Sequence, residues 1–420
     1  MWKETIQIGF LLGVRQIRHA SKWTTGLIIF IMMLTFLNLV AVSGILVGLI
    51  EGSVKAYSDQ FTGDVFLSTL GGKKYIEKST DMLATLDTIP GVAAYSARYT
   101  EGATIEANYR VRRDPQQLRD TVGTNLSGIN PESEEALTHI SKHLIEGEFL
   151  SPDDTNYIVL GSMLLEQYSP LGAQGDDAGF PTIKDVHVGS RVRVTVNGAT
   201  KEYIVKGILK TKVDEISRRA FLPEKEFIRF AGRTNLNVNE VSIRATTLAD
   251  APKVKQALLD SGIGANALVR LSREGLPTFL LDMIKTFDLL GNGISSVGLL
   301  VSSITIFIVI FVNAITRRKY IGILKGIGIR AEAIEFSYVI QSLLYAVVGS
   351  GLALIVIYGL LVPFFDANPI NFPFSDGILV APLSGTMVKL AILVISTLIA
   401  GYIPAWMIIK KNTLDSILGR

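Results

Sequence analysis

The stretch Arg317-Arg318-Lys319-Tyr320-Ile321-Gly322-Ile323-Leu324-Lys325-Gly326-Ile327-Gly328 lies between two long apolar segments and combines basic residues with spaced glycines. Lys and Arg concentrate in the cytoplasmic loops of membrane proteins, so this pattern indicates a short inner loop between two membrane helices. The segment therefore predicts a hairpin that carries its own brief helix. Such a hairpin is suited to receive force from a soluble partner on the inner side.

The apolar residues of this 420-residue chain are concentrated in four segments. Hydrophobic residues make up 48% of the chain and charged residues 19%, and the mean hydropathy is +0.37. Each segment is longer than the roughly 20 residues that a helix needs to cross the hydrocarbon core of a bilayer. We therefore predict four transmembrane α-helices, at residues 24–50, 289–315, 334–362 and 387–409.

The same segments divide the chain into domains. The apolar run 24–50 begins too late and is too long for a signal peptide, so we expect it to be retained as an anchor. The polar stretch 51–286 is large enough for one or two folded domains. Before the first span, residues 1–22 place Ile6, Phe10, Leu11, Val14 and Ile17 at helical spacing, which predicts an amphipathic helix on the inner membrane surface. The last three spans form a second domain, 287–409, and a tail follows at 410–420.

The basic residues predict the orientation in the membrane. They flank the first span on its N-terminal side, fill the loop between spans two and three, and follow span four, whereas the loop 363–385 has none. Both termini and the basic hairpin are therefore expected inside, and residues 51–286 outside. The basic residues concerned are Lys3, Arg15, Arg18, Lys22, Arg317, Arg318, Lys319, Lys325, Arg330, Lys410, Lys411 and Arg420.

The segment 51–286 alternates between strand-like and helix-like patterns, which predicts a mixed α/β domain. Residues 191–196 and 203–209 alternate around Asn197-Gly198 and predict a hairpin with a connection longer than two residues. A helix is expected over 131–145, with Asn130 as its cap. It would place His139 and His143 one turn apart, and we favour a solvated helix face there over a zinc site.

Polar and small residues within the spans are interpreted as packing positions. Membrane helices associate through small residues and hydrogen bonds, because lipid removes the hydrophobic driving force between them. We assign Asn38, Gly44 and Gly48 of the first span to helix packing. No acidic or basic residue lies at the middle of a span, which argues against an ion-coupled carrier.

Composition and motifs argue against several functions. The net charge of +3 is too small to indicate nucleic-acid binding. There is no Gly-x-x-x-x-Gly-Lys-Ser/Thr motif for nucleotide phosphates, and Gly71-Gly72-Lys73-Lys74 lacks both the first glycine and the hydroxyl. The chain has no cysteine, so its outer domain is not stabilised by disulfides. We expect no catalytic, cofactor or metal site.

Several motifs, taken in order, resemble the MacB/FtsX-type ABC transporter permease family, including its lipoprotein-releasing branch, over nearly the whole chain. The resemblance begins with the order of one span, a large outer domain and three further spans. The acidic residue that follows the basic cluster in some relatives is Tyr320 here, which leaves the branch open. The motifs that carry the resemblance are Tyr157-Ile158-Val159-Leu160-Gly161 with Val188-Gly189, then 203–208, 317–328 and Pro404-Ala405.

The resemblance implies a permease subunit of the bacterial cytoplasmic (inner) membrane. Residues 51–286 would be a MacB-like periplasmic domain and 287–409 an FtsX-like domain. A separate cytoplasmic P-loop ATPase would bind ATP and Mg²⁺, and a second permease copy or paralogue would complete the assembly. The permease would transmit nucleotide-driven closure to its outer domain for export, efflux or lipoprotein release. The coupling region would be about 321–336, with the contacts at Ile321, Gly322, Ile323, Leu324, Lys325, Gly326, Ile327, Gly328 and Arg330.

A second class of function remains open from the sequence. The outer domain could belong to an envelope sensor or scaffold that regulates an extracytoplasmic enzyme through a protein partner. The two hypotheses differ in whether activity depends on an ATPase. In the simpler interpretation of the hairpin, its three glycines only ease a turn and Arg317 to Lys319 only set topology.

Overall fold

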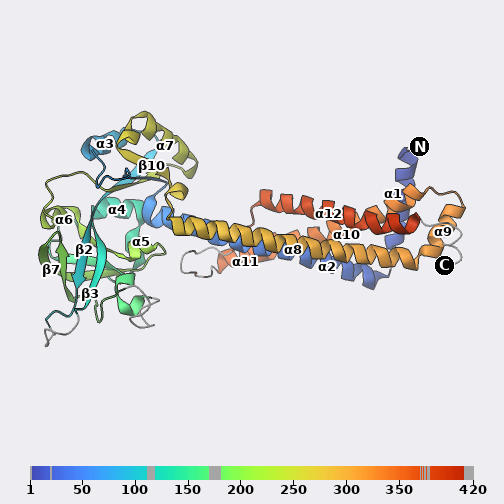
Figure 1. Ribbon diagram of the computed structural model, residues 1–420, viewed down its shortest axis with the longest axis horizontal. Coiled ribbons are helices and arrows are strands. Elements are labelled where there is room, and N and C mark those ends of the chain that lie inside the picture. The colour runs from blue at the N-terminus through green and yellow to red at the C-terminus, as the bar shows by residue number, and fades with distance from the viewer. Residues whose placement is uncertain are drawn as a thin grey trace. The chain divides into compact units, whose positions relative to one another are not determined.

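The chain folds into two compact units, which we call the membrane unit and the sheet unit (Figure 1). The sheet unit contains Gly52–Leu280 and Pro373–Ser375, and the membrane unit contains Met1–Glu51, Leu281–Phe372 and Asp376–Arg420. Of the predicted tail, 410–420, residues 411–420 lie outside the described residues. The structure is a computed structural model that describes residues 2–18, 21–110, 119–169, 181–368, 370, 372, 375 and 379–410.

Four helices in the described part of the chain are long and apolar enough to cross a membrane. With the mixed sheet described below, they confirm the predicted fold class. Each begins before its predicted apolar segment, at residues 22, 278, 331 and 383 instead of 24, 289, 334 and 387. A π-helical turn, Ser58–Thr62, follows α2, and another, Ile357–Leu361, joins α10 to α11. The helices are α1 (Trp2–Arg18), α2 (Lys22–Tyr57), α8 (Thr278–Thr316), α9 (Arg318–Gly326), α10 (Ala331–Val356), α11 (Val362–Ala367) and α12 (Leu383–Ile409).

Glycines allow the helices of the membrane unit to approach closely around α10. A side chain at Gly349 would come 2.6 Å from Met32 on α2, and one at Gly401 on α12 would come 2.5 Å from the Ser342 hydroxyl. α1 packs on the first half of α10 in the same way, through Gly9 and Gly13. These contacts are the small-residue packing that membrane helices favour. They make α10 the central element of the unit.

Ten strands in the described residues form one sheet, in the order β10-β1-β9-β2-β3-β8-β5-β7-β4, with β6 paired to β2 and β7. Most neighbours are antiparallel, but β3 pairs with β8 and β5 with β7 in parallel. The first strand therefore lies between the last two. The strands are β1 (Val65–Thr69), β2 (Val92–Glu106), β3 (Thr121–Ile129), β4 (Leu144–Gly147), β5 (Tyr157–Gly161), β6 (Arg191–Val196), β7 (Ala199–Leu209), β8 (Arg219–Pro223), β9 (Glu240–Ala245) and β10 (Ala267–Leu271).

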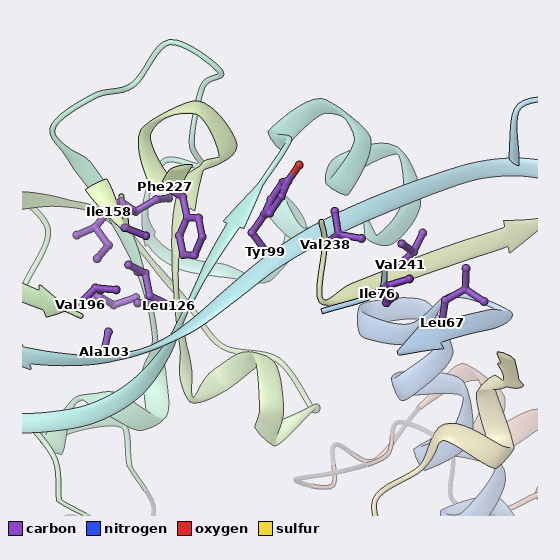
Figure 2. Close-up of a cluster of buried hydrophobic side chains, with 14 of the residues drawn as sticks. Leu67, Ile76, Tyr99, Ala103, Leu126, Ile158, Val196, Phe227, Val238 and Val241 are labelled. Atoms are coloured by element: carbon purple, nitrogen blue, oxygen red, sulfur yellow. The ribbon is translucent and has the colours of Figure 1, made fainter. Parts of the chain in front are cut away.

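A continuous apolar core stabilises the sheet unit (Figure 2). Alternate residues of the strands point into it, as the period of two in a strand requires. Phe227 of α6 packs so tightly against β3 that a side chain at Gly128 would come 2.5 Å from its Cβ. Because the chain has no cysteine, this core stabilises the unit without disulfides. The helices of this unit are α3 (Ser79–Leu86), α4 (Pro131–Thr138), α5 (Asp214–Ser217), α6 (Glu224–Phe230) and α7 (Ala251–Asp260).

Two local predictions for this unit are wrong. The helix expected over 131–145 ends at Thr138, because His139 adopts a left-handed conformation with φ of 49° and the chain turns into β4. His139 and His143 therefore do not lie one α-helical turn apart. The hairpin connection is also shorter than expected. Asn197 and Gly198 alone join β6 to β7, both with positive φ, which is the two-residue turn that suits the strand twist.

Candidate coupling site

The predicted hairpin consists of α9, a turn and the start of α10. α8 ends at Thr316, and α9 begins at Arg318. The helix ends in a Schellman motif, in which the Ile329 amide donates to the Leu324 carbonyl at 3.1 Å and the Gly328 amide to the Lys325 carbonyl at 3.1 Å. Gly328 supplies the left-handed residue that this motif needs, with φ of 91°. One of the three glycines thus does shape the turn.

One face of α9 packs against the other helices of the membrane unit. Ile321 and Leu324 are buried in the same apolar cluster as Ile334 of α10 and Ile408 of α12. Gly322 is buried beside them. An isolated helix of this length is marginal, so packing is what keeps α9 folded. The hairpin is therefore a structured part of the unit.

Lys325 ties α9 to the end of α12. Its Nζ donates a hydrogen bond of 2.6 Å to the carbonyl oxygen of Ile409, in the last turn of α12. The last carbonyls of a helix lack partners within the helix, and a basic side chain there also interacts favourably with the helix dipole. Of the predicted coupling residues, Lys325 thus takes part in anchoring the hairpin.

The opposite face of α9 is apolar and exposed. Ile323 is 49% exposed and Ile327 is 71% exposed, with Tyr320 on the same side. The spacing of three and four residues along the helix places these side chains in one stripe. Gly326, Gly328 and Arg330 are exposed next to it. The predicted residues thus separate into a buried anchoring set and an exposed stripe, which we call the α9 stripe: Tyr320, Ile323 and Ile327.

Removing the Lys325 anchor should loosen the hairpin. In a Lys325→Met chain, we expect Leu324 to become accessible about 10- to 150-fold more often, since a hydrogen bond to a charged donor contributes roughly 1.5–3 kcal/mol and every 1.4 kcal/mol is tenfold. The chain has no cysteine, so the maleimide labelling rate of a Leu324→Cys background reports this opening directly. Lys319→Met, on an exposed residue of the same helix, is the control. Equal labelling in all three chains would show that Lys325 does not anchor α9.

The predicted packing residues of α2 lie in different surroundings. The Val380 amide donates to the Gly44 carbonyl at 3.0 Å, and a side chain at Gly44 would come 2.9 Å from Leu379. Gly48 is buried. Asn38 is exposed, so its carboxamide lies on the outside of the membrane unit.

A charged cluster in the sheet unit follows the end of α2, and the sequence patterns did not identify it. We call it the Phe61 cluster: Phe61, Arg98, Glu134, Arg219 and Glu240. The Phe61 ring lies beneath two guanidinium groups, those of Arg98 and Arg219, each 4.9 Å from its centroid. Its carbonyl oxygen accepts a hydrogen bond of 2.8 Å from Arg98 Nη2.

Both guanidinium groups of the Phe61 cluster form bidentate ion pairs. Arg98 Nε and Nη2 donate to the two carboxylate oxygens of Glu134 at 2.9 and 2.6 Å, and both side chains are fully buried. Arg219 donates two bonds of 2.9 Å to Glu240. Burial opposes charge, yet Arg219 and Arg98 hold the pKa of Glu240 below its ordinary value. The Arg219–Glu240 pair therefore remains ionised at neutral pH. Together the contacts of the cluster join the turn after α2 to β2, α4, β8 and β9.

The sequence carries no clear signal for this cluster. Arg98 lies on the face of β2 opposite to Ala97 and Tyr99, which pack in the apolar core. Once its burial is known, a fully buried arginine requires a buried carboxylate, so the kind of partner follows. Its identity does not, because Glu134 lies on a helix 36 residues further along the chain.

The described residues contain no group of three or more His, Cys, Asp or Glu side chains placed to hold a metal ion. Of the two histidines considered from the sequence, His139 precedes the 3₁₀ turn Ile140–His143, and His143 is the last residue of that turn.

Comparison with known proteins gives a family match in the C-terminal part of the chain. Residues 292–413 match the family described as FtsX-like permease C-terminal, which confirms the predicted resemblance. The periplasmic region of MacB from Actinobacillus actinomycetemcomitans is similar in structure, with a TM-score of 0.32 and 14% identity, over 50% of this chain and 90% of that one. A similarity that weak carries no inference about function. None of the curated proteins matches this chain significantly.

Proposed function

Since residues 292–413 match the FtsX-like permease C-terminal family and four helices are long and apolar enough to cross a membrane, we propose that this chain is the permease subunit of an ABC transporter. A separate cytoplasmic P-loop ATPase supplies the energy by binding ATP and Mg²⁺. The observation that carries this proposal is the α9 stripe. Two isoleucines are exposed there on a short helix whose opposite face is buried and anchored.

The geometry of α9 suits a part that transmits a push. A contact surface that moved independently of the membrane helices would absorb the displacement of a partner. α9 is instead packed against α10 and α12 and hydrogen-bonded to the last turn of α12. An apolar stripe edged by basic residues matches the composition of a binding site, in which apolar anchors provide most of the affinity.

We further propose that the α9 side of the membrane unit is cytoplasmic, in the bacterial inner membrane. The Lys and Arg residues before α2 and around α9 support this orientation, because short basic loops remain inside. The sheet unit is then extracytoplasmic. It would move with α2, whose helix continues from Lys22 to Tyr57 and is followed by the Phe61 cluster.

A second permease copy or paralogue completes the proposed assembly. The exposed carboxamide of Asn38 supports it, because a polar side chain on an otherwise apolar membrane helix favours a hydrogen-bonding partner on another helix. Leu34, one turn earlier on α2, is also exposed. Transport, efflux and lipoprotein release all fit this arrangement, as does regulation of an extracytoplasmic enzyme driven by the same ATPase.

Site-specific cross-linking tests the proposal, because the chain contains no native cysteine. An Ile327→Cys chain, expressed in its native host and treated with a short thiol-to-amine cross-linker, should yield a product that contains a P-loop ATPase. Ile304→Cys, an exposed apolar position in the middle of α8, should not. If neither position captures an ATPase, the chain acts without one, and the envelope sensor or scaffold becomes the better account.

A further inference from the structure

Lys389 is the single charged residue in the sequence of α12, Leu383–Ile409. It is the seventh residue of this helix, so it lies roughly 9 Å along the axis from the first. The helix has 27 residues, which is somewhat longer than the roughly 30 Å hydrocarbon core requires. Lys389 therefore lies close to the boundary between acyl chains and headgroups. The other end of α12 is the one that contacts the α9 hairpin, where Lys325 donates a hydrogen bond to the Ile409 carbonyl.

The lysine has a polar partner but no counter-charge within the described residues. Its Nζ donates to the hydroxyl of Ser43 on α2, and Ser43 in turn donates to the Leu39 carbonyl at 2.8 Å. Tyr358 and Thr386 add neutral hydroxyls to the same end of the helix bundle. In the described part of the chain, no carboxylate forms an ion pair with Lys389. A lysine charge in this position is costly unless an anion neutralises it.

The surroundings of Lys389 indicate the source of the anion. The side chain is half-buried, at the edge between the packed face of α12 and its exposed face. The exposed face next to it is apolar, with Val388 at 59% and Ile395 at 58% exposure, and Ile392 between them. Such a face contacts acyl chains in a membrane. The group within reach of Nζ is then the headgroup of the lipid whose chains cover that face.

We propose that Lys389, oriented by Ser43, binds the phosphate of a phospholipid with a net negative headgroup. The acyl chains of this lipid lie along Val388, Ile392 and Ile395. A zwitterionic phospholipid has the same phosphate but brings its own cation, so it neutralises the lysine less well. The site belongs to the membrane unit alone and is independent of any ATPase.

Native mass spectrometry of the full chain tests this site. Purified protein is reconstituted in nanodiscs that contain phosphatidylglycerol and phosphatidylcholine and then released from them. The parent chain should retain phosphatidylglycerol in preference to phosphatidylcholine. In K389Q that retention should fall about fivefold, the size of one basic side chain's attraction to an anionic lipid near the membrane surface, whereas K389R should keep it. Lys285→Gln is the matched control, because Lys285 already pairs with Asp282 at 3.1 Å.

A second measurement compares melting temperatures. The melting temperature of the parent chain should be higher in phosphatidylglycerol nanodiscs than in phosphatidylcholine nanodiscs, and the difference should be larger than that seen for K389Q. Equal retention of phosphatidylglycerol by the parent and K389Q would overturn the proposal. So would a loss of self-association in K389Q with unchanged lipid retention, because a carboxylate of a second copy would then be the counter-charge.

Discussion

A chain that carries Ile323→Asp and Ile327→Asp is expected to bind its ATPase roughly a thousandfold more weakly than the parent while remaining folded. Both side chains are exposed, so charge there costs the isolated permease little. In an interface, each buried anchor of this kind contributes about 2 kcal/mol or more, and every 1.4 kcal/mol changes affinity tenfold. The measurement is the dissociation constant for the ATPase captured by cross-linking, with permease in detergent micelles.

The control for this pair is a change of the same chemistry elsewhere. Ile145 is an exposed isoleucine in the sheet unit, and Ile145→Asp should leave ATPase binding unchanged. Conversely, Ile321→Asp should unfold the hairpin, because Ile321 is buried in the membrane unit. If the double variant binds within threefold of the parent, the α9 stripe is not the contact surface. The Lys325 anchor would then serve stability alone.

Replacing Glu134 by Gln should destabilise the sheet unit by about 3–5 kcal/mol. The substitution keeps the size of the side chain but removes the bidentate partner of the buried Arg98 guanidinium. The carboxylate that is left, Glu240, lies 4.0 Å from Arg98 and already forms two hydrogen bonds with Arg219. Breaking a buried ion pair from one side is among the most costly single changes, because the remaining charge stays out of water. Pulse proteolysis of the full chain in increasing urea measures this free energy of unfolding for the sheet unit.

The matched control is Glu202→Gln. Glu202 also forms a 2.6 Å ion pair, with Arg110, but the side chains of Arg110 and Glu202 are 56% and 38% exposed. Exposed pairs contribute about 0–1 kcal/mol, so the unfolding midpoint should change little. Equal midpoints for the two variants would mean that the Phe61 cluster does not stabilise the unit.

The hairpin was predictable because its signals are local. Basic residues, apolar flanks and Gly328 specify a short inner helix and its end without reference to any distant segment. The division of α9 into a buried and an exposed face was not predicted. It depends on where α10 and α12 pack, and those contacts join Leu324 to residues that lie some eighty positions later.

Other features depended on tertiary structure. His139 ends α4 because the following residues pair with β7, which overrides the helical pattern of 131–145. The Phe61 cluster joins five distant positions. Lys389 was overlooked as a charge in a span, because the predicted segment began only two residues before it. The helix instead begins at Leu383, so Lys389 lies in its second turn.

The order of the strands determines how the sheet unit responds to a pulling force. β1 and β10 are antiparallel neighbours, and Val65, where β1 begins, pairs with Leu271, where β10 ends. A force that pulls these two ends apart acts on one rung of the ladder at a time, so it opens the pair like a zipper. A force that moves both ends together loads no rung. The unit is therefore expected to withstand displacement as a whole and to yield first between β1 and β10 when the two ends are separated.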